Sequence, residues 1–180
     1  YYEGESEMLE YLEPPAHLVI PLVQDALSNP DDPRYQSAVL LLGVVGRGGA
    51  AAVPYLVSAC TNANRTTRQL AVQSLEHLGR SAHGAESALT NALLDPLTRR
   101  RAIRALGRLG PEAASTIACL KPFLSSTYAA ERIEAAAALH RIDPQIGTLD
   151  RLITAAGNTN VPGQQRWRLT RWWGESRMLV

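Results

Sequence analysis

The sequence predicts an all-α fold, an α-solenoid in which about five antiparallel helix pairs stack on one another. The 180 residues are 46% hydrophobic but only 6% aromatic, a composition typical of helices packed through alanine, leucine and valine. A twelve-residue pattern recurs four times, about 33 residues apart, and an apolar segment followed by a polar turn precedes each copy. A unit of this length is too small to bury its apolar face alone, so the units must stack.

The recurring pattern predicts the second helix of each unit. Its copies are YQSAVLLLGVVG, RQLAVQSLEHLG, RRRAIRALGRLG and RIEAAAALHRID, at residues 35–46, 68–79, 99–110 and 132–143. A leucine stands at the same place in each copy, and we call these the repeat leucines: Leu42, Leu75, Leu106 and Leu139. Apolar residues lie four and three before each repeat leucine and three after it, on one helical face. Glycine ends the first three copies, and we expect Gly46, Gly79 and Gly110 in the left-handed region.

The apolar segments between these copies predict the first helices. They are HLVIPLVQDAL, AAAVPYLVSAC, GAESALTNALL and STIACLKPFL, at residues 17–27, 50–60, 84–94 and 115–124. We therefore expect one domain at 17–180, with units at about 17–49, 50–82, 83–113 and 114–145 and a degenerate fifth unit at 146–176. Residues 1–16 contain five glutamates and no basic residue, which indicates an acidic lead-in or linker.

The units carry a family resemblance. GPEA at a unit junction, AVPYLVSAC in a first helix and R-x-x-A-x-x-x-L in a second helix together resemble HEAT repeats of the short bacterial type, which also occur in phycobilin-lyase-like proteins. The resemblance implies a solenoid whose second helices line a concave surface. It also implies that the arginine seven residues before the repeat leucine bonds turn carbonyls or an acidic turn residue. Those arginines are Arg68, Arg99 and Arg132, and Asp95 is the expected acid for Arg99.

A row of arginines is the strongest candidate for a binding surface. Arg101, Arg104 and Arg108 lie on the helix face opposite the apolar stripe, so we expect them to be exposed. By resemblance, neighbouring second helices would extend the row with Gln73, His77 and Arg141. A solvated row is one interpretation, and a surface that binds carboxylates or phosphates is the other.

The segment at 164–177 is a second candidate. Tryptophans and arginines are interleaved in it, and we expect four of these residues to contact a partner: Trp167, Arg168, Arg171 and Trp172. Such a pattern suits base stacking and phosphate contact. It equally suits the end of a solenoid, where large rings close the apolar face or dock on a partner, and this interpretation is favoured.

The distribution of charge narrows the choice of partner. Residues 1–82 hold five basic against nine acidic residues, and residues 83–180 hold thirteen against eight. This polarity can steer a partner but is far below that of a dedicated nucleic-acid binder. We therefore predict a protein partner with an acidic surface, with nucleic acid as the alternative. A further alternative is that the acidic lead-in folds over the arginine row.

No residue pattern predicts catalysis, a cofactor or a metal site. The four histidines lack the pairing and neighbouring carboxylates that metal binding needs. Cys60 and Cys119 lie two units apart, beyond disulfide reach. The resemblance leaves a lyase or a DNA glycosylase as less favoured functions. No apolar run approaches the length of a membrane span. The first residue is not Met, so we expect a processed chain or a piece of a longer one, with a cytoplasmic location favoured over an extracytoplasmic one.

Overall fold

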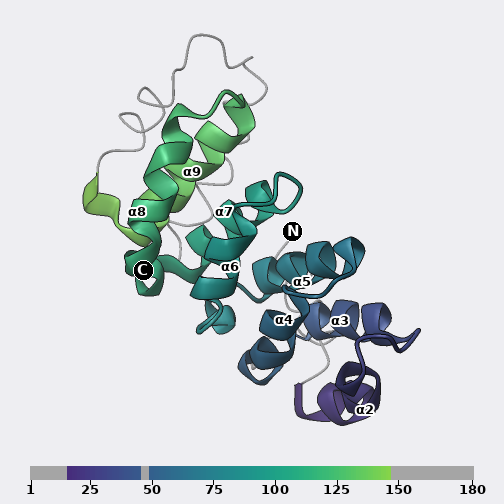
Figure 1. Cartoon of the computed structure of the whole chain (residues 1–180). Helices are drawn as coiled ribbons and strands as arrows, with labels where there is room; N and C mark the ends of the chain where they lie inside the picture. The colour runs from purple at the N-terminus through teal and green to yellow at the C-terminus, as the bar shows by residue number, and fades with distance from the viewer. Residues whose placement is uncertain (1–15, 46–48, 147–180) are drawn as a thin grey trace, which may run out of the picture.

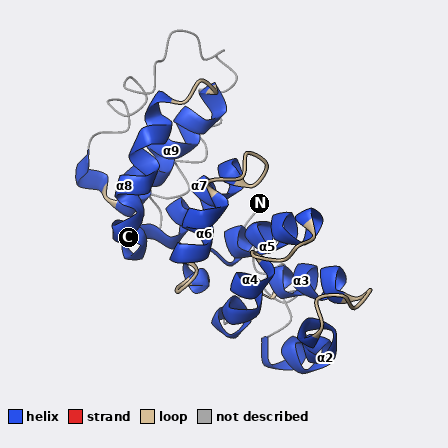
Figure 2. Cartoon of the chain, viewed as in Figure 1, coloured by secondary structure: helices blue, strands red, loops and turns tan. Residues whose placement is uncertain are grey.

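The computed structural model describes residues 16–45 and 49–146, and these residues form helices and turns without a strand (Figure 2). The prediction of an all-α fold is therefore confirmed for this part of the chain. Ala16, predicted as the end of the acidic lead-in, is the first residue of α2. The rest of the lead-in, Gly46 and nearly all of the expected fifth unit lie outside the described residues.

The helices follow one another as pairs along the chain. The first helices are α2 (Ala16–Ser28), α4 (Val53–Ala59), α6 (Glu86–Ala92) and α8 (Ile117–Leu120). The second helices are α3 (Tyr35–Val44), α5 (Arg65–Leu78), α7 (Arg99–Leu109) and α9 (Ala129–Ile142). Short 3-10 helices join them: η1 (Gly49–Ala52), η2 (Gly79–Ala82), η3 (Gly110–Thr116), η4 (Lys121–Ser125) and η5 (Pro144–Ile146).

One predicted first helix is broken. The segment 115–124 divides into the end of η3, the four residues of α8 and the start of η4. Pro122 has no backbone N–H and cannot make the bond that would continue α8, so the chain tightens into a 3-10 turn.

Each second helix packs against the next. α3 contacts α5, α5 contacts α7 and α7 contacts α9, while each first helix lies against its own partner (Figure 1). The four repeat leucines are completely buried, as the periodicity predicts. The helices therefore share one continuous core that runs from α2 to α9.

Small residues allow close packing of two pairs of second helices, α3 with α5 and α7 with α9. A Cβ added to Gly43 of α3 would lie 2.6 Å from the Cβ of Ser74 in α5, and one added to Gly107 of α7 would lie 2.8 Å from the Cβ of Ala138 in α9. Both glycines directly follow a repeat leucine, and both partners directly precede the next one. In α5 the equivalent position holds Glu76, so the contact between α5 and α7 must be built differently.

The predicted glycine terminators are confirmed in part. Gly79 and Gly110 cap α5 and α7 with positive φ values of 53° and 73°. Their ψ values of −123° and −148° place them in the mirror image of extended backbone rather than in the left-handed helical region. Glycine reaches this region at little cost because it lacks a Cβ.

Candidate functional site

Glu76 is the centre of a charge cluster between α5 and α7. Its side chain is only 6% exposed, because the position after the repeat leucine faces the next second helix. Arg104 of α7 donates from Nε to Glu76 Oε1 at 2.9 Å and from Nη2 to Oε2 at 3.1 Å. This two-point pairing is the strong, geometrically specific form of an arginine–carboxylate contact.

Two more arginines flank the same carboxylate. Arg101 Nη1 lies 3.7 Å from Glu76 Oε2, and Arg108 Nη2 lies 3.8 Å from Oε1. Arg108 also donates from Nη1 to the backbone carbonyl of Glu76 at 3.0 Å. Arg104 reaches onward to α9, where its Nη1 lies 3.4 Å from Glu134 Oε1. One buried carboxylate thus holds three guanidinium groups, and one of these bridges three helices.

The expectation that the arginine row is exposed is therefore wrong. The side chains of Arg101, Arg104 and Arg108 are 40%, 23% and 36% exposed, because Glu76 draws all three inward. Sequence reasoning missed Glu76, although one signal was present. Directly after the repeat leucine, one unit has the acidic Glu76 where two other units have glycine. Arginines occupy the facing turns of the next second helix.

The ionisation of the cluster reflects this packing. Burial disfavours the charge on Arg104, but the hydrogen bonds and negative charges of Glu76 and Glu134 outweigh it and raise the pKa of the guanidinium. Burial also raises the pKa of Glu134, because the opposing effect of Arg104 is the smaller one. On α9, burial and the charge of Arg108 lower the pKa of Arg141 to about 10. Arg141 therefore belongs electrostatically to the same cluster.

The predicted contacts continue along equivalent positions of the second helices. We define the register row as the residues two before and two after each repeat leucine: Leu40 and Val44, Gln73 and His77, Arg104 and Arg108, Ala137 and Arg141. His77 is exposed, whereas Gln73 and Arg141 are half-buried. Leu40 and Val44 are 44% and 51% exposed. The register row therefore changes from apolar on α3 through polar on α5 to cationic on α7, and on α9 it holds one alanine and one arginine.

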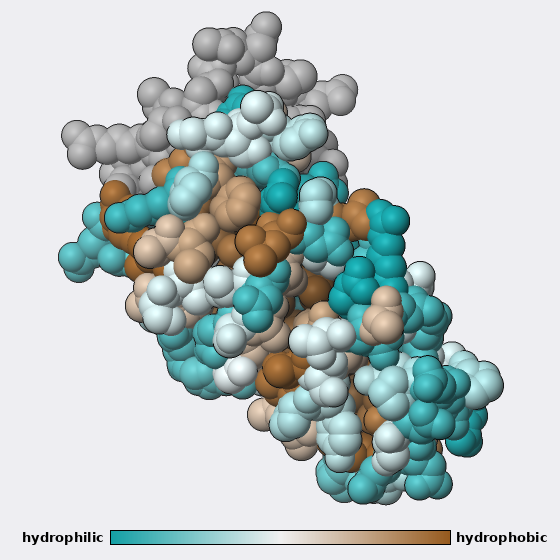
Figure 3. Space-filling view, viewed as in Figure 1, coloured by the Kyte–Doolittle hydropathy of each residue, from teal (hydrophilic) through white to brown (hydrophobic). Residues whose placement is uncertain are grey.

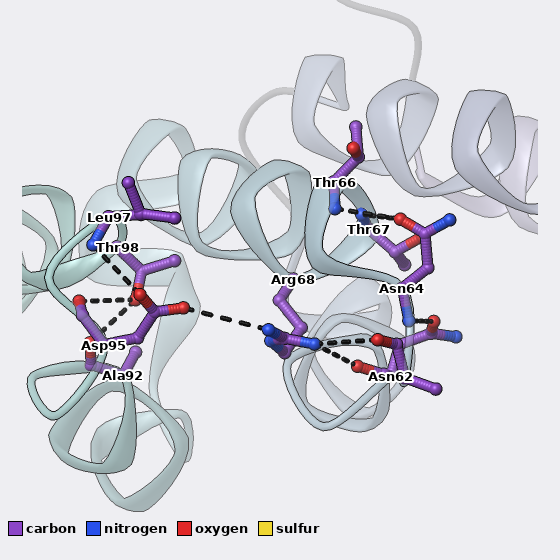
Figure 4. Close-up of polar contacts among 10 residues, drawn as sticks. Asn62, Asn64, Thr66, Thr67, Arg68, Ala92, Asp95, Leu97 and Thr98 are labelled. Atoms are coloured by element: carbon purple, nitrogen blue, oxygen red, sulfur yellow. Dashed lines mark hydrogen bonds and ion pairs between the residues drawn. The ribbon is translucent and has the colours of Figure 1, made fainter.

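The turn arginines have the structural role that the resemblance implies. Arg68 Nη1 donates to the carbonyls of Asn62 and Ala63, both at 2.9 Å (Figure 4). Arg132 makes the equivalent bonds to the carbonyls of Ser126 and Thr127 at 2.9 and 3.2 Å. These bonds satisfy turn carbonyls that would otherwise lack a partner at the helix end.

The prediction that Asp95 is the acidic partner of Arg99 is wrong. Arg99 Nε donates to the carbonyl of Leu93 at 2.8 Å, and its Nη1 lies 3.5 Å from Glu131 in the next unit. Asp95 instead lies 3.9 Å from Nη2 of Arg68, in the preceding unit (Figure 4). Both ion pairs link neighbouring units because each turn lies beside the next turn along the molecule.

A surface pocket of about 440 Å³ adjoins the charge cluster at the start of α7 and α9. Its wall includes the first three arginines of α7, together with Arg104 and Glu131. Leu97 and Tyr128, which are 43% and 65% exposed, also line it. The sequence did not predict this pocket, because its two sides come from different units.

The described residues offer little for catalysis. No group of three or more His, Cys, Asp and Glu side chains among them could hold a metal ion. Burial raises the pKa of the Cys60 thiol to about 12, which keeps it protonated at neutral pH. Cys60 and Cys119 are both free thiols.

The second predicted contact site cannot be placed beside this cluster. Trp167, Arg168, Arg171 and Trp172 lie outside the described residues.

No helix within 16–45 and 49–146 is long and apolar enough to cross a membrane. Comparison of the chain with protein-family models, with curated proteins and with solved structures finds no match.

Proposed function

We propose that the chain is a HEAT-like solenoid that acts as a non-catalytic scaffold and binds a partner protein along the second helices. The observation that carries this proposal is the register row, whose side chains change from apolar on α3 through polar on α5 to cationic on α7. A partner segment that lies across these helices would place apolar residues over Leu40 and Val44 and acidic residues over Arg108. Interfaces of this mixed kind are typical of protein–protein recognition.

The pairing of the arginines favours a protein over a nucleic acid. A phosphate backbone is bound by cations that release its counterions. Three arginines of the cluster already face Glu76, and Arg104 also faces Glu134, so the two carboxylates balance part of their charge within the protein. Figure 3 shows hydrophobic and hydrophilic residues side by side on the face that it draws.

The flanking arginines keep capacity for a partner. A guanidinium has five N–H donors. Arg108 donates one to the carbonyl of Glu76, and its side chain remains 36% exposed. Among the described residues, Arg101 makes only the 3.7 Å contact with Glu76. A carboxylate on a partner would therefore meet guanidinium groups that Glu76 already holds in place, which reduces the entropy lost on binding.

A binding experiment with two probes of equal charge tests the proposal. The first is a labelled twelve-residue peptide of eight glutamates and four leucines, and the second is a labelled single-stranded oligonucleotide with eight phosphates. Fluorescence anisotropy at near-physiological salt should show binding of the peptide by the full chain. Arg108→Ala and Leu40→Ser should each weaken it, while Arg65→Ala, at an exposed arginine of α5, should not.

Tighter binding of the oligonucleotide would contradict the proposal. If its affinity also fell linearly with the logarithm of salt concentration, phosphate recognition would replace protein recognition as the function. Absence of peptide binding would refute the proposal that the partner has an acidic surface.

A further inference from the structure

We propose that the pocket at the start of α7 and α9 is the anchor point for the acidic partner, and that it takes one carboxylate together with the apolar side chain next to it. This inference rests on the proposed function and specifies where on the surface the partner is held. The volume of about 440 Å³ is within the range of sites that bind small groups, and two side chains of a peptide would occupy it.

The wall of the pocket is held by internal contacts. Arg99 is fixed by the Leu93 carbonyl, by Glu131, and by the ring of Phe123, whose centroid lies 5.8 Å from its guanidinium carbon. Glu131 also accepts a hydrogen bond from Ser126 Oγ at 2.5 Å. Arg104 is fixed by Glu76. These groups form a preorganised support and do not need to rearrange when a ligand enters.

Two guanidinium groups of the pocket remain available. Arg100 is exposed and makes no hydrogen bond or ion pair with the residues that the structure describes. Arg101 is 40% exposed, and within 16–45 and 49–146 its one ion pair is the long contact with Glu76. A carboxylate that enters the pocket can therefore accept hydrogen bonds from both without displacing an internal partner, unlike a carboxylate that competes for Arg104.

The surrounding field adds to the attraction for an anion. Arg100 and Arg101 lie in the first turn of α7, where the helix dipole is positive, and no side chain caps that turn. Thr98, at the capping position, donates its hydroxyl to the carbonyl of Ala92 at 2.7 Å instead. Cations at this end of a helix repel its dipole, so a bound carboxylate would relieve an unfavourable arrangement as well as form new bonds.

The apolar part of the pocket decides between a carboxylate-bearing peptide and a phosphate backbone. Leu97 and Tyr128 line the pocket with side chains that are largely open to solvent. An apolar side chain beside the carboxylate would cover them and remove apolar surface from water. A phosphate group by itself would leave that surface exposed, whereas a base of a single strand would compete for Tyr128 by stacking, which is why the oligonucleotide is the competing probe. The pocket therefore fits an acidic residue with an apolar neighbour.

The test uses the full chain, the peptide of glutamate and leucine, and a control peptide in which glutamine replaces every glutamate. Arg100→Ala should weaken binding about tenfold, because it removes one hydrogen bond to a charged group. Tyr128→Ala should weaken it about threefold by loss of apolar contact. Arg65→Ala removes the same charge from the first turn of α5, away from the pocket, and should change binding less than about twofold. Circular dichroism should show that all three variants keep their helix content.

The outcomes separate the anchor from the scaffold. Equal loss in Arg100→Ala and Arg65→Ala, with Arg108→Ala still weakening binding, would overturn the anchor and leave the proposed function standing. Equal binding of the glutamate and glutamine peptides would overturn recognition of a carboxylate in the pocket. Failure of the unaltered chain to bind the glutamate peptide would overturn the proposed function and the anchor with it.

Discussion

Replacement of Glu76 by glutamine tests the charge cluster most directly. The amide keeps the volume of the side chain and one acceptor oxygen but removes the negative charge from three guanidinium groups, of which Arg104 is the most buried. Breaking a buried pair by neutralising one partner costs roughly 3–5 kcal/mol. Since Arg104 keeps contact with Glu134 and with solvent, we expect a loss of about 2 kcal/mol in the free energy of unfolding.

Urea unfolding followed by circular dichroism would measure this loss. Glu112→Gln is the matched control, because Glu112 is 56% exposed and its one ion pair in the part of the chain that the structure describes is with His83 at the surface. A surface pair of this kind is worth about 0–1 kcal/mol. The double variant Glu76→Gln with Arg104→Met isolates the interaction, since loss of both partners should cost less than the sum of the two single losses.

Two results would refute the reasoning. If Glu76→Gln were as stable as Glu112→Gln, the burial of the carboxylate would have no energetic consequence. If the losses from Glu76→Gln and Arg104→Met simply added, the paired geometry would not be the source of the stability.

Three further predictions follow from other contacts, each measured by the same unfolding experiment. Gly107→Ala should cost about 1–3 kcal/mol, because its Cβ would overlap the backbone and Cβ of Ala138. Arg68→Ala should cost about 1–2 kcal/mol through two lost bonds to turn carbonyls, while Arg65→Ala should be neutral. Glu134→Gln should leave stability at pH 7 unchanged or raised, because burial keeps the pKa of Glu134 above its unfolded value. The folded state then binds this proton more readily than the unfolded state, so the unfavourable contribution of ionised Glu134 shrinks as pH falls through its folded-state pKa.

Each of these has a clear contrary result. A neutral Gly107→Ala would mean that α7 and α9 separate at no cost. Equal stabilities of Arg68→Ala and Arg65→Ala would mean that the hydrogen bonds of Arg68 to the turn carbonyls do not stabilise the fold. A clear loss in Glu134→Gln at pH 7 would mean that attraction to Arg104 exceeds the burial penalty.

Local periodicity was enough to predict the helices and the core. The repeat leucines and their apolar neighbours obey a spacing of three and four residues, which depends only on the geometry of a single helix. The contacts of the turn arginines were expected from the resemblance to HEAT repeats, and Arg68 and Arg132 do reach carbonyls five or six residues away in the chain.

One first helix was predicted as continuous but is broken in the structure. The apolar segment 115–124 reads as one helix, but Pro122 removes a bond near its end and α8 stops after four residues. Proline alone does not place such a boundary from the sequence, because Pro21 lies inside α2 and that helix continues to Ser28.

What the sequence by itself determined is therefore the all-helical class, the buried stripe and the turn contacts. The tertiary structure alone decided that Arg104 faces Glu76, that Asp95 faces Arg68, and that the pocket forms beside Arg100. The physical reason is that these contacts join residues from different units, about 30 positions apart. Their existence depends on the offset and rotation between neighbouring second helices. The side chain directly after each repeat leucine sets that spacing, small at Gly43 and Gly107 and large and charged at Glu76.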